Sequence, residues 1–143
     1  MYSHTQPGKL MCYIFLPIAI FSFMSFMFIQ NLMILLVGIL MAVALYLFRN
    51  LTAEIKEGYL IFYFDSGFIR RKIKIADIVS AKSVRNPWYF GWGVRWFGRG
   101  WLYNVSGLDA VEVALRNGTV FRIGTDEPNK LENAIHQHQS ILR

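Results

Sequence analysis

The hydrophobic pattern begins with one long uncharged stretch near the N-terminus. From Leu10 to Phe48, 39 consecutive residues include no Asp, Glu, Lys or Arg. Apolar runs longer than ~18 residues are typical of membrane-spanning helices, and the polar pair Gln30-Asn31 divides this run in two. At ~1.5 Å per residue each half forms a helix of roughly 26–28 Å, close to the ~30 Å hydrocarbon core of a bilayer. The pattern predicts a transmembrane helical hairpin with spans at about residues 11–29 and 32–48.

Two other interpretations of this stretch are a cleaved signal peptide and shallow insertion into one leaflet. A cleaved signal peptide needs a short apolar core that ends in small residues, whereas the first half ends in bulky side chains at 26–29 and a second half follows at once. Shallow insertion into one leaflet stays open, because both halves are short for a full span.

The charges that flank the hairpin predict its orientation. Lys9 precedes the first half, Arg49 and Lys56 follow the second, and the turn between them is uncharged. Because positive residues remain on the cytoplasmic side, we expect both termini to be cytoplasmic. Residues 1–50 then form the membrane hairpin and residues 51–143 a cytoplasmic domain. The segment before the hairpin, which carries His4, is expected to be loose.

Short segments separated by turn signals follow the hairpin and indicate a mainly-β domain. Within 68–75, Ile69, Ile73 and Ile75 lie on one face of a strand, and Arg70, Lys72 and Lys74 lie on the other. This alternation is typical of a half-exposed strand. Further strands are expected at 51–56, 59–64, 78–85, 94–97 and 101–105.

The segment 109–123 predicts a β-hairpin whose register is set by its hydrophobic parity. A two-residue turn at Asn117-Gly118 would pair apolar with polar positions across the two strands. A three-residue loop, residues 116–118 with Gly118 in the left-handed region, aligns Val113 with Phe121 and Val111 with Ile123. Since a slip of one residue turns every side chain to the other face, we expect the three-residue loop.

The C-terminal segment predicts an amphipathic helix. Thr125 or Asp126 can cap its start, and Pro128 suits the first turn. One face of the helix carries residues at helical spacing, and we expect it to pack on the sheet: Leu131, Ala134, Ile135, His138 and Leu142.

This order of elements resembles a known family. The stretches "RNPWYFGWG" (85–93), "GWLYNVSGLDAVEV" (100–113) and "FRIGTDEP" (121–128) before the final helix are similar to those of small bacterial membrane proteins with a pleckstrin-homology-like (PH-like) domain. The resemblance implies about seven strands in a bent sheet or barrel, capped by a C-terminal helix, and a location in the bacterial inner membrane. It supplies no catalytic residues, and the fold does not determine the function.

A search for chemistry-bearing motifs gives no catalytic, metal-binding or cofactor-binding pattern. No His-Glu-x-x-His, paired-cysteine or phosphate-loop motif is present. His136 and His138 diverge by roughly 200° on a helix and cannot easily share a metal. We therefore expect a protein that is not an enzyme, binds no cofactor or metal, and, because of its membrane tether, binds no nucleic acid.

Charge and aromatic residues are concentrated in one region. Residues 69–103 hold eight basic residues and one acidic residue, and residues 85–101 hold all four tryptophans. We expect Trp96, Trp101 and Tyr103 to lie in the core. We expect the loop after Pro87 to meet a membrane or a partner, because Trp and Tyr favour the headgroup zone and arginines meet lipid phosphate. The candidate binding residues are Arg70, Lys72, Lys74, Arg85, Trp88, Tyr89, Phe90, Trp92, Arg95 and Arg99.

Two functional hypotheses follow. In the first, the protein is a noncatalytic membrane-anchored binding or scaffolding protein whose domain contacts anionic lipid headgroups at the inner leaflet. In the second, it is an accessory subunit or assembly factor of a larger membrane protein complex, or a homo-oligomer, and binds protein rather than lipid. The basic strand 68–75 can also be simply a solvated face.

Overall fold

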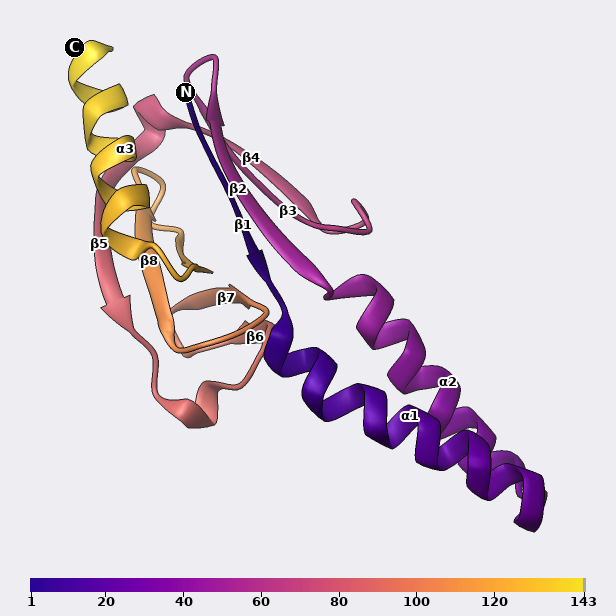
Figure 1. The fold of residues 1–143 in the computed structure, drawn as a ribbon. Helices are drawn as coiled ribbons and strands as arrows, with labels where there is room; N and C mark the ends of the chain where they lie inside the picture. Colours follow the sequence, from indigo (N-terminus) through magenta and orange to yellow (C-terminus); the bar gives the residue numbers. More distant parts are fainter. Residues whose placement is uncertain (143) are drawn as a thin grey trace.

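The computed structural model describes residues 1–142, and it places a helical hairpin beside a mainly-β domain that ends in a helix (Figure 1). The hairpin comprises α1 (Lys9–Ile29) and α2 (Leu32–Leu47). The domain comprises β1 (Tyr2–Pro7), β2 (Asn50–Lys56), β3 (Tyr59–Phe64), β4 (Arg70–Lys74), β5 (Ile78–Arg85), β6 (Gly93–Trp96), β7 (Gly100–Asn104), β8 (Asp109–Leu115), β9 (Val120–Gly124) and α3 (Pro128–Ile141), with 3₁₀ turns η1 (Ile75–Asp77) and η2 (Trp88–Phe90).

The predicted hairpin is present, with its turn at the polar pair. Gln30 ends α1 in the left-handed conformation, and the Asn31 side chain accepts the backbone N–H of Met33 at 2.9 Å. The two helices pack closely where Gly38 faces Ser22. By length and composition α1 could cross a membrane, and 11% of its most apolar window is buried, whereas α2 with its 16 residues is a shorter apolar helix.

The expectation of a loose N-terminus is wrong. Residues Tyr2–Pro7 form β1, which pairs antiparallel with β2 from Tyr2↔Ile55 to Pro7↔Asn50. The hairpin is therefore inserted between two paired strands, and both of its ends are fixed to one sheet (Figure 1). His4 lies on this strand, with its imidazole against the carboxylates of Asp126 and Glu127.

The first sheet has the order β1-β2-β3-β4. The alternation predicted for 68–75 is present, because Ile73 is partly buried and packs against the core. On the opposite face, Arg70 lies over the ring of Tyr63 and the Lys72 ammonium lies 4.1 Å from the centre of the Tyr59 ring.

The second sheet has the order β5-β8-β9-β7-β6. The predicted register of the β8–β9 hairpin is confirmed: Val113 pairs with Phe121 and Val111 with Ile123. Gly118 has a φ of 84°, in the left-handed region, as the three-residue loop requires. The parallel pairing of β7 with β9 was not anticipated from the sequence.

One hydrophobic core lies between the two sheets and α3. Its fully buried members come from every layer and include Ile55 and Phe62 of the first sheet and Val111 and Ile123 of the second. From α3, Leu131, Ala134 and Ile135 are buried as expected, but Leu142 is 54% exposed at the end of the helix. The start of α3 also differs, because Glu127 is the N-cap and the Thr125 hydroxyl accepts the Glu127 N–H.

The assignment of three aromatic residues to the core is only partly right. Tyr103 is buried, but Trp96 is 59% exposed and Trp101 is 44% exposed. These two rings pack edge to face on paired positions of β6 and β7. They form the last pair before the turn that joins β6 to β7.

Candidate functional site

Trp92 and the start of β6 lie beside the base of the hairpin. A shallow cavity there is lined by Met11 and Phe15 of α1, Ala44 and Phe48 of α2, and residues 92–95. Gly93 is within van der Waals distance of this base, since a Cβ placed on it would lie 3.9 Å from Met11 and from Phe48. The sequence thus brings Trp92 and Arg95 to the level at which the apolar helices leave the domain.

The aromatic residues before this segment are largely open to solvent. Trp88 and Tyr89 are 75% and 68% exposed, although both belong to large apolar residue types. Their rings form an edge-to-face series in which Tyr89 also contacts Phe90. Phe90 is anchored by stacking on Phe97. In Figure 1, this turn between β5 and β6 lies at the end of the domain from which the hairpin leaves.

Trp92 and Arg95 are held in position by backbone acceptors. The Trp92 indole donates to the carbonyl of Gly107 at 3.0 Å, and the Arg95 guanidinium donates to the carbonyl of Trp92 at 3.1 Å. Within residues 1–142, Arg95 has no carboxylate within salt-bridge distance, so its charge is available at the hairpin base.

Two of the predicted basic residues are engaged elsewhere. Arg99 donates to both carboxylate oxygens of Glu112, at 3.0 and 2.9 Å. Glu112 also accepts from Arg122, whose guanidinium lies 4.5 Å from the centre of the Phe97 ring. Arg85 lies 3.4 Å from Asp109 on an exposed surface. Arg99 is therefore part of an ion-pair network that ties β8 and β9 to the turn after β6.

The other four predicted basic residues fall into two groups, Arg95 at the hairpin base and three residues on β4. Arg70, Lys72 and Lys74 lie on β4, away from the segment 88–95. In the described chain none of these three has a carboxylate partner. The candidate residues therefore form two surfaces, one at the hairpin base and one on β4.

Three residues at the hairpin base were not among the binding residues predicted from the sequence. Lys9 and Arg49 line a cavity at the junction of the two helices with the sheet, and their signal was their position on each side of the apolar run. Phe68 is 80% exposed in the turn between β3 and β4. This turn is tied to the hairpin base, because Asp65 N–H donates to the Asn50 carbonyl at 3.0 Å.

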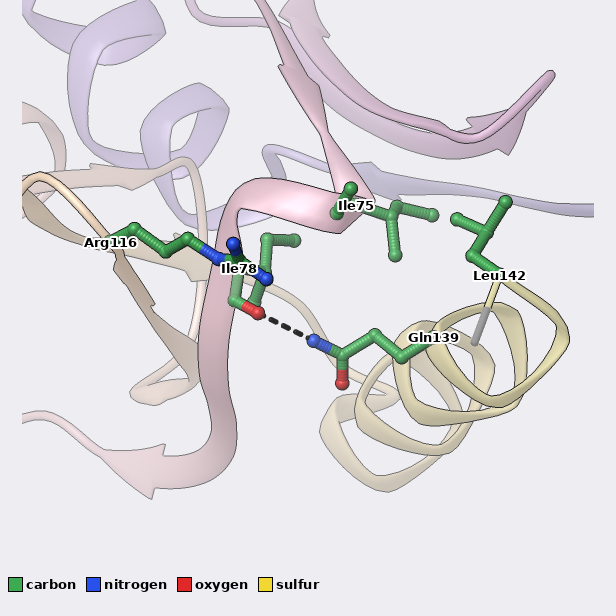
Figure 2. A pocket seen from close by; sticks show the side chains of 6 residues that line it. Ile75, Ile78, Arg116, Gln139 and Leu142 are labelled. Carbon is green, nitrogen blue, oxygen red and sulfur yellow. Dashed lines mark hydrogen bonds between the residues drawn. The ribbon is translucent and has the colours of Figure 1, made fainter.

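The C-terminal helix covers the outer edge of β5 with polar side chains. Gln139 donates to the carbonyl of Ile78 at 2.7 Å (Figure 2), and His136 lies 3.1 Å from the carbonyl of Ala81. The Glu132 carboxylate accepts the Ser83 N–H at 2.7 Å and also the Ser83 hydroxyl. These hydrogen bonds hold the pKa of Glu132 below its ordinary value. The small pocket in Figure 2 is thus a structural contact of α3 with η1 and β5.

The N-terminal strand meets the start of α3 in a second polar cluster. Burial raises the pKa of Tyr2 to about 12, and the negative charges of Glu127 and Asp126 contribute in the same direction. His4 lies between the same two carboxylates. Among residues 1–142, no group of three or more His, Cys, Asp or Glu side chains is arranged to hold a metal ion.

Comparisons with known proteins identify no relative of this chain. No family model, no curated protein and no solved structure matches it.

Proposed function

We propose that this chain is a noncatalytic membrane-anchored binding protein whose PH-like domain contacts anionic lipid headgroups at the inner leaflet. The hairpin of α1 and α2 lies in the bilayer, with both termini on the cytoplasmic side. The segment 88–95 lies at the headgroups, with Trp88, Tyr89 and Trp92 in the interface and Arg95 on lipid phosphate.

The position of residues 92–95 beside Met11, Phe15, Ala44 and Phe48, with which they line one cavity, carries this proposal. If the apolar helices are in lipid, this position places Trp92 at the membrane surface. Exposed Trp and Tyr side chains favour the headgroup zone, where an apolar ring and a polar N–H or O–H are both satisfied. The location and the aromatic content of the segment therefore support the same function.

The exposed apolar surface of the hairpin supports the membrane location. Large side chains along both helices are open on the outer surface, among them Phe21 at 72%, Phe28 at 86% and Met33 at 69%. Apolar patches of this extent are rare on soluble monomers. Lipid or another protein in the bilayer would cover them.

Charge favours an anionic leaflet. Lys9, Arg49 and Arg95 all lie at the hairpin base, and within the described chain none has a carboxylate partner. Each cation close to an anionic membrane surface contributes ~1 kcal/mol. Three such residues would enrich anionic lipid around a chain that is already anchored.

Energy transfer tests the lipid preference. The full chain is reconstituted in nanodiscs that contain either dansyl-labelled phosphatidylglycerol or dansyl-labelled phosphatidylcholine, and transfer from tryptophan is compared over a salt series. We expect more transfer to the anionic lipid, a decrease in the preference as salt screens it, and a smaller preference in Arg95→Glu, which leaves Lys9 and Arg49 in place. Arg116→Glu, in the β8–β9 loop, is the matched control. Equal transfer to both lipids at low salt would exclude the lipid function.

The alternative function is that of an accessory subunit that binds protein. The feature that favours it is the exposed edge of β4, which is separate from the hairpin base.

A further inference from the structure

The outer edge of β4 has backbone groups that no other strand uses. The pairs of β3 and β4 that exchange backbone hydrogen bonds are fixed by two contacts: Phe64 N–H donates to Ile69 C=O at 3.1 Å, and Ile75 N–H donates to Gly58 C=O at 2.9 Å. In an antiparallel ladder such pairs alternate, so Arg71 and Ile73 also face β3 with their backbone groups. The N–H and C=O groups of Arg70, Lys72 and Lys74 therefore point away from the sheet.

An apolar groove runs beside this free edge. Arg71, Lys72 and Ile73 of β4 form one wall, and Trp101, Val120 and Phe121 of the second sheet lie on the other side. Arg71 reaches across it, because its guanidinium donates to the Tyr103 hydroxyl at 3.3 Å. An added strand on β4 would place every second side chain over the groove and the others on the opposite face.

The two faces of such a strand would meet different chemistry. On the groove side its neighbours are Ile73, Trp101 and Phe121, which suit apolar side chains, and Arg71, whose guanidinium is bound to the Tyr103 hydroxyl. On the other face its cross-strand neighbours are Arg70, Lys72 and Lys74, which suit acidic side chains. Within residues 1–142, no Asp or Glu lines the groove or lies within salt-bridge distance of these basic residues.

β4 and β5 are both edge strands that carry basic side chains, but only the edge of β5 is covered. The edge of β5 is covered by α3, whose Glu132, His136 and Gln139 take up the outward backbone groups of Ser83, Ala81 and Ile78. In the described chain, nothing comparable covers β4. Lysines on an edge also discourage pairing with unspecified strands. Pairing of this edge with β4 of a second copy of the chain is disfavoured, because the four basic residues of each strand would lie against each other.

We propose that the free edge of β4 binds an extended segment of a partner protein in which acidic and apolar residues alternate. The segment adds a strand to the first sheet, with its apolar side chains in the groove and its acidic side chains against Arg70, Lys72 and Lys74. This mode of recognition obtains affinity from the main chain and specificity from alternate side chains. The proposal does not depend on the contact of residues 88–95 with lipid.

Fluorescence anisotropy with a labelled peptide of alternating Glu and Val tests this surface. The full chain is held in nanodiscs of neutral phosphatidylcholine, so that lipid charge does not compete. We expect saturable binding, weakened by about tenfold or more in R70E/K72E/K74E because three favourable charge pairs become repulsive. Lys82→Glu on β5, whose edge α3 covers, should bind as the wild type does. A peptide of alternating Lys and Val should bind the triple variant and not the wild type.

N-methylated peptides separate strand addition from attraction of charge alone. Methyl groups on the Glu nitrogens block the amides that face β4 in antiparallel pairing, and methyl groups on the Val nitrogens block those that face it in parallel pairing. We expect one of these two peptides to lose binding and the other to keep it. The proposal would be overturned by an absence of saturable binding to the wild type, by equal binding of the triple variant, or by full binding of both methylated peptides.

Discussion

Gly8 donates its backbone N–H to the carbonyl of Arg49 at 2.7 Å and so joins the two ends of the helical hairpin. The contact lies one residue beyond Pro7↔Asn50, the pair that ends the β1–β2 ladder, at the point where the chain enters α1. A Cβ on Gly8 would lie 2.6 Å from the carbonyl oxygen of Arg49 and 2.8 Å from that of Phe48. The close approach of these backbones explains a glycine at this position.

Gly8→Ala should destabilise the protein. The added methyl group has no room between two backbone carbonyls, so β1 and the start of α1 must move apart, at a cost of about 1–3 kcal/mol. Thermal unfolding of the full chain in nanodiscs, followed by circular dichroism, measures the effect. Ser3→Ala, at an exposed position of the same strand, is the control. An unchanged melting temperature for Gly8→Ala would contradict the close approach.

The hydrogen bonds that Ser83 donates to the Glu132 carboxylate should stabilise the fold at pH values above the ordinary carboxyl pKa. Glu132→Ala leaves the Ser83 N–H at the β5 edge without its partner, and we expect a loss of about 1–3 kcal/mol at pH 7. Gln137→Ala, on the exposed face of α3, should have little effect. Chemical denaturation of both variants gives the comparison.

The same carboxylate predicts a pH dependence. Its pKa in the folded protein lies below the ordinary value of 4.5, so its ionised form is favoured by folding. The contribution is present above pH 4.5 and is lost as the pH falls through the folded-state pKa. The difference in unfolding free energy between the wild type and Glu132→Gln should therefore decrease on acidification. A difference that grows at low pH would refute the role of the carboxylate.

The raised pKa of Tyr2 should make the free energy of unfolding decrease at alkaline pH. Its pKa rises from 10.0 to about 12 in the folded protein, so that folding favours the protonated phenol. The stabilisation is complete below pH 10 and is lost as the pH rises toward 12. Unfolding of the wild type should therefore be more sensitive to pH between 10 and 12 than unfolding of Tyr2→Phe. Identical pH profiles of the two proteins would show that β1 does not bury this hydroxyl.

The parts of the fold that the sequence predicted have strong hydrophobic parity or clear breaks. The register of β8 and β9 followed from pairing Val113 with Phe121, because the alternative mixes core and surface. The hairpin turn followed from Gln30-Asn31 within an uncharged run. Burial selects the register of β8 and β9, and the polar pair interrupts the apolar run of the hairpin, so the pattern alone was sufficient in both cases.

The parts that the sequence did not predict depend on long-range pairing. β1 is a polar edge strand and has no alternation of apolar residues that could predict it. Its contacts are polar: Gln6 donates to the carbonyl of Ser106, and the hydroxyls of Thr5 and Thr52 are hydrogen-bonded. Trp96 and Trp101 are exposed beside the β6–β7 turn, and the sequence does not show which end of a strand pair the core covers. Selecting candidate residues by charge also grouped Arg99 with Arg95, although Arg99 is paired with Glu112 and Arg95 is not.

The depth of Trp92 relative to the bilayer tests the central claim most directly. Two single-tryptophan variants of the full chain are compared: one keeps Trp92 and the other keeps Trp101, with phenylalanine at the other tryptophan positions. Each is reconstituted in vesicles whose lipids are brominated near the headgroup end of the acyl chains. The proposed arrangement predicts strong quenching of Trp92 at the hairpin base and weak quenching of Trp101, which lines the groove beside β4. Equal quenching of both, or none of Trp92, would contradict it.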